Sequence, residues 1–225
     1  MNEQNKKIEE IVTVVCVSLL LLTTMIVFEK MINVPFENVT GEVLTTVRII
    51  ETRSAYCNFT LEAGLNLVSF FCIRNGAHRD EVIENITNLE SIFEYQENAQ
   101  DRWKSYNPSL PWFVIQDLEL MHRTEGYWIR MRAREDFLTE GGLRLINYVN
   151  LVPGWNLAGY PTNKTKSVNE SFASIEGNFT EVRAYNASTQ VFTNYIPGVG
   201  GGLTATTPNL GYWINVSVIE VWVVD

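Results

Sequence analysis

The stretch GWNLAGYP at residues 154–161, together with GYWI at residues 211–214, decides the fold, because both blocks occur twice in the chain. The earlier copies are GLNLVSF at residues 64–70 and GYWI at residues 126–129. The two opening blocks are 90 positions apart and the two closing blocks 85, so that only the loops between them differ in length. Self-similarity at this spacing indicates an internal duplication. The sequence therefore predicts two related units in tandem.

The composition suits folded units of this size. The 225 residues are 46% hydrophobic and 12% aromatic, which is enough for a real core and argues against disorder. The formal net charge is -9, and an acidic protein gains nothing from the release of phosphate counterions, so we expect no nucleic acid among its partners. Three cysteines and two histidines are too few and too scattered for a metal site of recognisable spacing, and we expect no cofactor.

The N-terminal region contains an apolar run that predicts a membrane anchor. Residues 11–28 include no charged side chain, and as a helix they would span about 27 Å, close to the thickness of the hydrocarbon layer. Lys6 and Lys7 precede the run, and positive charge favours a cytoplasmic N-terminus. We therefore expect a cytoplasmic segment at 1–10, a single transmembrane helix at 11–29 and an extracellular remainder in the cell membrane. A cleaved signal peptide, a pilin-like leader and a buried core helix remain alternatives.

Eight N-x-S/T sequons follow the apolar run, and none precedes it. They begin at Asn38, Asn58, Asn85, Asn163, Asn169, Asn178, Asn186 and Asn215. Such a sequon accepts a glycan only on a translocated surface, so the one-sided distribution predicts N-glycosylation of an extracellular region. The alternative is that Asn, Ser and Thr simply populate turns.

Cys57 and Cys72 fit the same location. Two apolar runs meet between them at residues 62–65, and a hairpin centred there would place the two cysteines opposite each other. Facing cysteines on neighbouring strands meet the geometry of a disulfide, and closing a loop of about 15 residues stabilises a fold by roughly 3 kcal/mol. Because an extracellular setting favours oxidation, we predict a Cys57–Cys72 disulfide.

Amphipathic helices are expected at corresponding places in the two copies. In the first copy Asp80 is the expected N-cap, and apolar residues at helical spacing share one face. That face consists of Val82, Ile86, Leu89 and Phe93. In the second copy Val168, Phe172 and Ile175 repeat the pattern on a smaller scale. A further short helix is expected at 115–122.

Strand signals dominate the rest of the chain. Alternating, β-branched patterns predict strands at 42–50, 143–151 and 216–224, and a hairpin at 182–195. The most charged segment, 130–142, is the expected connector between the units.

The expected fold class is therefore β-rich α+β, with an N-terminal transmembrane helix followed by two tandem related units with short helices. A stalk and first strand are expected at 30–55, repeat unit 1 at 56–142 and repeat unit 2 at 143–225.

No pattern in the sequence points to a catalytic site, and we expect no enzyme. The glycine-rich run at 198–202 lacks the third glycine of a dinucleotide-binding motif and the Lys of a phosphate-binding loop, so a surface turn is expected. His78 and His122 have no counterparts in the second copy, and no nucleophile or orienting carboxylate is evident for either. Glu135 and Asp136 lie in the charged connector, where we expect them to be solvated.

Aromatic side chains that recur in both copies are the main candidates for ligand contacts. They are Trp103, Tyr106, Trp128, Trp155, Tyr160, Tyr195 and Trp213. Flat rings bind the apolar faces of sugars, but residues that recur at matched positions are more often core residues, which is the interpretation we favour. Trp112, in the loop at 107–112, has no such counterpart and is the first candidate for an exposed ligand platform.

The blocks at 154–161 and 211–214, with an amphipathic helix and a Tyr-centred strand between them, resemble a tandem repeat of prokaryotic, mostly archaeal, secreted or membrane-anchored surface glycoproteins. In the first copy CNFTLEAGLNLVSFFC at 57–72 resembles versions from archaeal surface glycoproteins. The resemblance covers about residues 57–216, and Leu65 stands where the pattern has Trp. It implies a cell-surface setting and transfers no catalytic residue.

The expected function is that of a membrane-anchored cell-surface glycoprotein with a structural, adhesive or interaction role. Its expected partners are the membrane, through residues 11–29, N-linked glycans, and surface proteins, glycans or copies of itself. One alternative is a subunit of an extracellular filament, packed by its N-terminal helix as in a pilin. Another is an envelope enzyme such as a glycan hydrolase. Because the matched blocks form the scaffold, function is expected where the copies differ, in the loops at 107–112 and 198–202.

Overall fold

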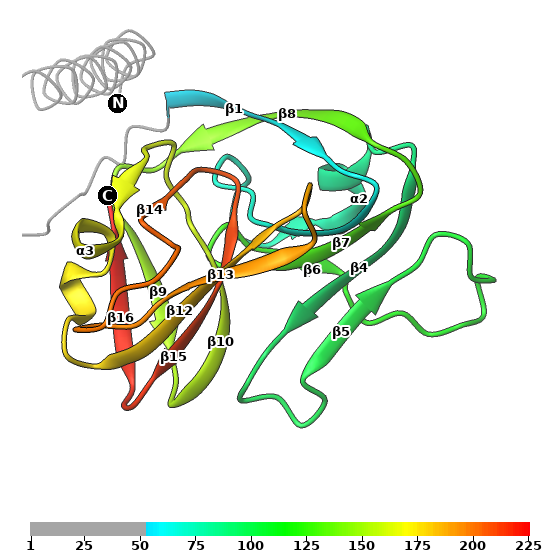
Figure 1. Cartoon of the computed structure of the whole chain (residues 1–225). Coiled ribbons are helices and arrows are strands. Elements are labelled where there is room, and N and C mark those ends of the chain that lie inside the picture. Colours follow the sequence, from blue (N-terminus) through cyan, green and yellow to red (C-terminus); the bar gives the residue numbers. More distant parts are fainter. Residues whose placement is uncertain (1–52) are drawn as a thin grey trace, which may run out of the picture. The chain divides into compact units, whose positions relative to one another are not determined.

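The computed structural model describes residues 53–225, to which every structural statement below refers (Figure 1). This region is rich in β-strands and contains only short helices, as expected from the sequence. No helix in it is long and apolar enough to cross a membrane. The transmembrane helix expected at 11–29, the strand at 42–50 and the sequon at Asn38 lie outside the described residues.

The elements follow the same order in the two halves of this region. The first half contains β1 (Arg53–Leu61), β2 (Gly64–Val68), β3 (Ala77–His78), α2 (Arg79–Ile83), β4 (Leu89–Tyr95), β5 (Trp103–Tyr106), β6 (Leu120–Met121), β7 (Tyr127–Met131) and β8 (Glu135–Leu143). The second half contains β9 (Asn147–Leu151), β10 (Gly154–Gly159), β11 (Lys166–Ser167), α3 (Val168–Ser171), the 3-10 helix η2 (Ala173–Ile175), β12 (Phe179–Asn186), β13 (Val191–Tyr195), β14 (Ala205–Thr206), β15 (Gly211–Val216) and β16 (Glu220–Val224).

Each half builds the same three antiparallel sheets. The four-stranded sheets have the strand orders β2-β7-β4-β5 and β10-β15-β12-β13. Longer two-stranded sheets pair β1 with β8 and β9 with β16, and short ones pair β3 with β6 and β11 with β14. The duplication of the sequence blocks is therefore accompanied by a duplication of topology.

The opening block of each copy turns the chain from one sheet into the next. Gly64 and Gly154 have φ angles of +92° and +103°, in the region that favours glycine. Asn66 accepts a hydrogen bond from the N–H of Glu62 at 2.8 Å and donates one to the carbonyl of the same residue at 2.8 Å. Asn156 makes the same pair of bonds four residues back. The glycine and asparagine of the block thus have the same structural role in both copies.

A disulfide joins Cys57 to Cys72, with the Cα atoms 5.7 Å apart, as predicted. The hairpin that was expected to bring the two cysteines together is wrong. β1 pairs with β8, which places Cys57 opposite Thr139, whereas β2 pairs with β7. The turn before β2 leads the chain into the other sheet, and the segment beyond β2 then returns to β8, where the N–H of Gly142 donates to the carbonyl of Cys72 at 2.8 Å.

The helix of the first copy is shorter than expected. α2 begins after His78, whose Nδ1 accepts a hydrogen bond from the N–H of Asp80, so Asp80 is not the N-cap. Val82 is buried in the helix, but the last two residues of the expected helical face, Leu89 and Phe93, belong to β4.

Glu135 explains why the chain turns after α2. Its carboxylate accepts hydrogen bonds from the N–H groups of Thr87 at 2.9 Å and Asn88 at 2.8 Å, which are then not available to a longer helix. Burial raises the pKa of Glu135, but these hydrogen bonds outweigh it and hold the pKa below its ordinary value. The segment 130–142, expected to be the connector between the units, contains the end of β7 and all but the last residue of β8. Asp136 does remain exposed, where it accepts a hydrogen bond from the hydroxyl of Thr60.

Three further expectations have different outcomes. The helix expected at 115–122 is wrong, since Leu120–Met121 form β6, which pairs with β3. Val168, Phe172 and Ile175 of the second copy are all buried, although the helical segment is divided between α3 and η2. The hairpin at 182–195 is present as β12 and β13.

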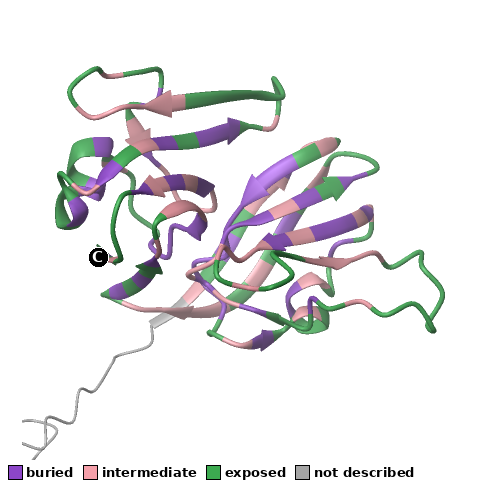
Figure 2. Ribbon diagram, turned by 90° about the horizontal axis from the view of Figure 1, so that it is seen from below, coloured by how far each residue is buried: buried purple, intermediate pink, exposed green. Residues whose placement is uncertain are grey.

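Each half encloses its own apolar core, visible as buried segments in Figure 2. In the first half the rings of Phe59, Phe70 and Phe137 pack at inclined angles with centroids 5.3–5.7 Å apart. In the second half Trp222 stacks on Phe172 at 4.7 Å, and its indole N–H donates to a backbone carbonyl. The polar atom of this large ring is thus satisfied inside the core.

Candidate functional site

All described residues belong to one compact unit. Within it, the two halves meet where the closing block of one copy approaches the opening block of the other. Val68, at the end of β2, forms a β-bridge with Leu210, and Ala158 in β10 forms the equivalent bridge with Glu125. Backbone hydrogen bonds of 3.0 and 2.9 Å continue the two bridges by one residue. Since the opening blocks are 90 positions apart and the closing blocks 85, these two bridges join equivalent positions in the two copies.

The glycine of each GYWI block makes this approach possible. A Cβ atom at Gly126 would lie 3.0 Å from the carbonyl oxygen of Ala158, and one at Gly211 would lie 2.9 Å from that of Val68. Both distances are shorter than ordinary contacts with a carbon atom. The recurring glycine is therefore explained by the contact between the halves.

The tryptophan of each GYWI block crosses to the other half. Trp213 packs against Tyr95 at 5.1 Å between ring centroids, and Trp128 packs against Tyr185 at 4.9 Å. Phe192 completes the second cluster at 6.0 Å from Trp128. These rings line the facing sides of the two four-stranded sheets, so they belong to the junction between the halves.

The other recurring aromatic residues have separate surroundings. Tyr160 is fully buried in the second core, and Trp155 is partly covered by the guanidinium of Arg183, 4.5 Å from its ring. Trp103 packs against Tyr95 but remains 44% exposed. Tyr106 lies under the guanidinium of Arg79 at 3.6 Å, and the hydroxyl of Tyr195 donates to Asn169 at 2.7 Å.

Trp112 lies in the most exposed apolar segment of the described region. We call Leu110–Ile115 the apolar loop; within it Trp112 is 93% exposed, Ile115 94% and Phe113 69%. The loop projects between β5 and β6, away from the sheets, in both views (Figures 1 and 2). Contiguous apolar side chains in water are unfavourable for a monomer, and such a patch is typical of a binding surface.

The base of the apolar loop is held by polar side chains. Asp117 accepts a hydrogen bond from the N–H of Ser105 at 2.7 Å, and the side chain of Gln116 accepts one from the N–H of Asn107. Asn107 in turn accepts a hydrogen bond from the N–H of Ser109 at 2.9 Å. The loop therefore has an ordered base, and its tip presents the rings of Trp112 and Phe113 at 6.0 Å from each other.

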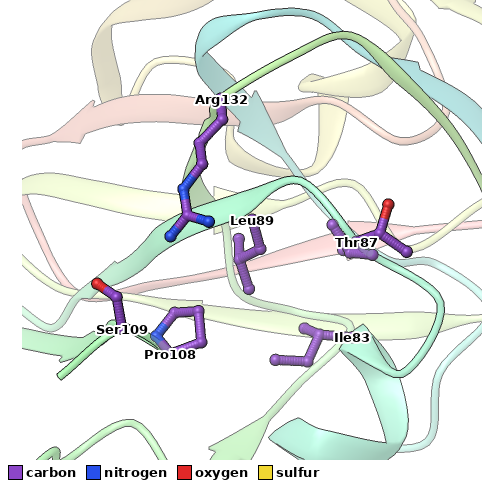
Figure 3. A pocket seen from close by; sticks show the side chains of 7 residues that line it. Ile83, Thr87, Leu89, Pro108, Ser109 and Arg132 are labelled. Carbon is purple, nitrogen blue, oxygen red and sulfur yellow. The ribbon is translucent and has the colours of Figure 1, made fainter. Parts of the chain in front are cut away.

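A pocket of about 310 Å³ lies at the base of the apolar loop (Figure 3). Its lining comes from α2, the segment between α2 and β4, the first residue of β4, the loop base and the segment after β7. The lining residues are Ile83, Ile86, Thr87, Leu89, Pro108, Ser109 and Arg132. Pro108 and Ser109 belong to the candidate loop at 107–112, so the pocket and the exposed rings are parts of one surface.

A pair of glutamates that sequence inspection missed lies in the first half. Glu94 is 1% exposed on β4, where its carboxylate accepts a hydrogen bond from the side chain of Gln96. Burial raises the pKa of Glu94, and burial together with the charge of Glu94 raises the pKa of Glu125 to about 8. The second half has Ala184 and Leu210 at the matching positions, so a comparison of the two copies would have revealed the pair.

The histidines and the glycine-rich run have structural roles. His78 is the N-cap of α2, and the Nδ1 atom of His122 accepts a hydrogen bond from the N–H of Gly76 at 3.2 Å. In the run at 198–202, a Cβ atom at Gly201 would collide with the carbonyl of Asn194. Among residues 53–225, no group of three or more acidic, histidine or cysteine side chains is arranged to hold a metal ion.

The sequons within the described region differ in accessibility. Most of their asparagines are exposed: Asn58, Asn85, Asn163, Asn169 and Asn186. Asn178 and Asn215 are partly buried, and the amide of Asn178 donates to Glu220 at 2.6 Å. A glycan on Asn178 would have to break this hydrogen bond.

Comparison with known proteins identifies no relative: no protein-family model, no curated protein and no solved structure matches the chain. The candidate site therefore rests on its own geometry, which combines an exposed apolar loop with a pocket at its base.

Proposed function

We propose that the chain is a membrane-anchored cell-surface glycoprotein with an adhesive or interaction role, and that its apolar loop docks onto a protein partner. The observation that carries the proposal is the exposure of Trp112 and Ile115, at 93% and 94%, in a loop whose base is ordered. Burying such side chains on association is favourable by roughly 1.5–3 kcal/mol each. Aromatic anchors of this kind commonly dominate the energy of protein interfaces.

The loop is separate from the first strand of the described region. In both views it projects from the sheets on the side away from the beginning of β1 (Figures 1 and 2). The loop is therefore available to a partner that does not contact β1.

The burial of Glu94 argues for binding without catalysis. A pair of carboxyl groups is the arrangement used by many glycan hydrolases, but such groups must reach the scissile bond. Glu94 is 1% exposed and is hydrogen-bonded within the first half, so a sugar has no access to its carboxylate.

The experiment compares cells that display the full chain with cells that display loop variants. The double substitution Trp112→Ser and Ile115→Ser should abolish adhesion to a layer of cells from the same source. Ile219→Ser is the matched control, because Ile219 is 76% exposed between β15 and β16, outside both candidate loops, and should tolerate the change. Unchanged adhesion of the double variant, at equal surface display, would refute the role of the loop. Protection of residues 30–225 from protease added to intact cells would refute the surface location.

A further inference from the structure

Arg132 differs from the two arginines that flank it in alternate positions. Arg130 pairs with Glu90 at 3.2 Å, and Arg134 pairs with Glu62 at 3.7 Å. Arg132 has no ion-pair or side-chain hydrogen-bond partner among residues 53–225, and its guanidinium points toward the pocket wall formed by Pro108 and Ser109 (Figure 3). A positive charge is thus presented at the pocket, and it has no carboxylate partner among residues 53–225.

The other polar groups of the pocket are already engaged. The hydroxyl of Thr87 donates to Glu135 at 2.9 Å, and that of Ser109 donates to Asn107 at 2.6 Å. Glu135, the acidic group beside the pocket, accepts hydrogen bonds from the backbone after α2. Arg132 therefore supplies the free hydrogen-bond donors of the pocket, and a ligand of the pocket must supply a hydrogen-bond acceptor.

The remaining walls of the pocket are aliphatic. They are formed by Ile83, Ile86, Leu89 and Pro108. An aliphatic group fits these walls, and a carboxylate fits the planar fork of a guanidinium, with which it forms charge-assisted, bidentate hydrogen bonds.

We propose that this pocket binds an aliphatic side chain with an adjacent carboxylate, presented by an extended segment of the protein partner. The proposal rests on the proposed function and specifies the chemistry of the partner. A volume of about 310 Å³ is at the lower end for small-molecule sites and suits one or two residues better than a long acyl chain. Continuity with the apolar loop through Pro108 and Ser109 favours a polypeptide, because one chain can cover both surfaces.

The test uses the full chain in detergent micelles with ¹³C-labelled isoleucine methyl groups. N-acetyl-leucine is the probe, and its uncharged amide is the matched compound without the carboxylate. The methyl signals of Ile83 and Ile86 should shift in a saturable manner, with a Kd for the acid at least tenfold below that for the amide. Ile175, which is buried at the corresponding place in the second half, should not respond.

Variants of Arg132 and of the flanking Arg130 show which side chain gives the preference for the acid over the amide. Arg132→Met should reduce the affinity for the acid to that for the amide, while Arg132→Lys should retain part of the preference. Arg130→Met removes a neighbouring charge that already has a partner and should leave the preference intact. The isoleucine spectrum without probe checks that each variant is folded.

Several results would overturn the proposal. They are equal affinities for acid and amide, an unchanged preference in Arg132→Met, and equal shifts at Ile175. Decanoate that binds tenfold more tightly than N-acetyl-leucine would assign the pocket to a lipid and overturn the polypeptide assignment. Trp112 does not line the pocket, so the two proposals can fail separately. Loss of the preference for the acid would refute the pocket assignment alone. Adhesion that does not depend on the loop would refute the proposed function.

Discussion

Trp213 of the second half packs against Tyr95 of the first with ring centroids 5.1 Å apart, although 118 positions separate them in the sequence. The equivalent pair, Trp128 and Tyr185, packs at 4.9 Å. Each copy therefore supplies the tryptophan of its closing block to the sheet of the other copy. Because neither half covers its own aromatic face, we expect the two halves to unfold together.

The ring contact across the junction can be measured by a double-mutant cycle. Trp213→Ala should lower the free energy of unfolding by about 2–3 kcal/mol, because a partly buried large ring loses its packing. The double variant Trp213→Ala, Tyr95→Ala should lose about 1 kcal/mol less stability than the sum of the two single losses. This difference is the energy of the aromatic pair. Chemical denaturation measures these free energies. Trp112→Ala is the control at an exposed ring and should change stability by less than about 0.5 kcal/mol. Full additivity would show that the two rings do not interact.

Replacing the glycine of either GYWI block by alanine, which adds only a Cβ atom, should destabilise the protein. Gly126→Ala and Gly211→Ala place a Cβ atom 3.0 and 2.9 Å from a carbonyl oxygen of the other half, and each should destabilise the protein by about 1–3 kcal/mol. Gly202→Ala is the control, since its Cβ would meet Thr193 at an ordinary 3.7 Å. Equal thermal midpoints for all three variants would contradict the close approach of the halves.

Glu125, a partly buried glutamate at the junction, predicts a pH-dependent stability. Burial and the neighbouring charge of Glu94 raise the pKa of Glu125 from 4.5 to about 8, so the folded protein holds a proton that the unfolded chain releases. The stability contributed by this group is present below pH 4.5 and is lost as the pH rises toward 8. Glu125→Gln, which keeps the shape without the charge, should be more stable than the wild type at pH 8 by on the order of 2 kcal/mol.

Glu135→Gln is the matched control for this titration and should behave in the opposite way. The hydrogen bonds from Thr87 and Asn88 hold the pKa of Glu135 below its ordinary value, so its contribution is present at neutral pH and is lost as the pH falls. Thermal unfolding between about pH 3 and pH 8 compares the two variants, because the contribution of Glu135 is lost only below its unfolded pKa of 4.5. A Glu125→Gln profile parallel to that of the wild type would show that Glu125 does not titrate in this range.

The disulfide makes a prediction that intact-mass measurement can check. Alkylation of the denatured, unreduced chain should modify Cys16 alone, whereas prior reduction should expose Cys57 and Cys72 as well. Replacing the pair by serine should cost about 3 kcal/mol, because the bond closes a loop of 15 positions. Three alkylated cysteines without reduction would contradict the bond.

Local signals in the chain were sufficient for much of this architecture. The recurring blocks predicted the repeated topology, the turn-rich stretch within 182–195 predicted the β12–β13 hairpin, and the apolar spacing of Val168, Phe172 and Ile175 predicted three buried residues. The exposure of Trp112 agreed with its place in a proline-bounded loop without a counterpart. Turn chemistry and side-chain periodicity act over a few residues, which is why sequence reveals them.

Long-range pairing was decided by the tertiary structure. The cysteines are joined as predicted, yet through a pairing of β1 with β8 that no local pattern distinguishes from a hairpin with β2. The same holds for the pocket, whose lining combines α2, the loop base and Arg132 from separate stretches of the chain.

The GYWI blocks illustrate the difference most clearly. Their recurrence, readable in the sequence, established a duplicated scaffold with glycine and tryptophan at matched positions. Only the folded arrangement shows that the glycine admits the backbone of the other copy and that the tryptophan packs on its sheet. The physical reason is that a sequence pattern specifies which side chains need a partner, whereas the partner is selected by packing between residues far apart in the chain.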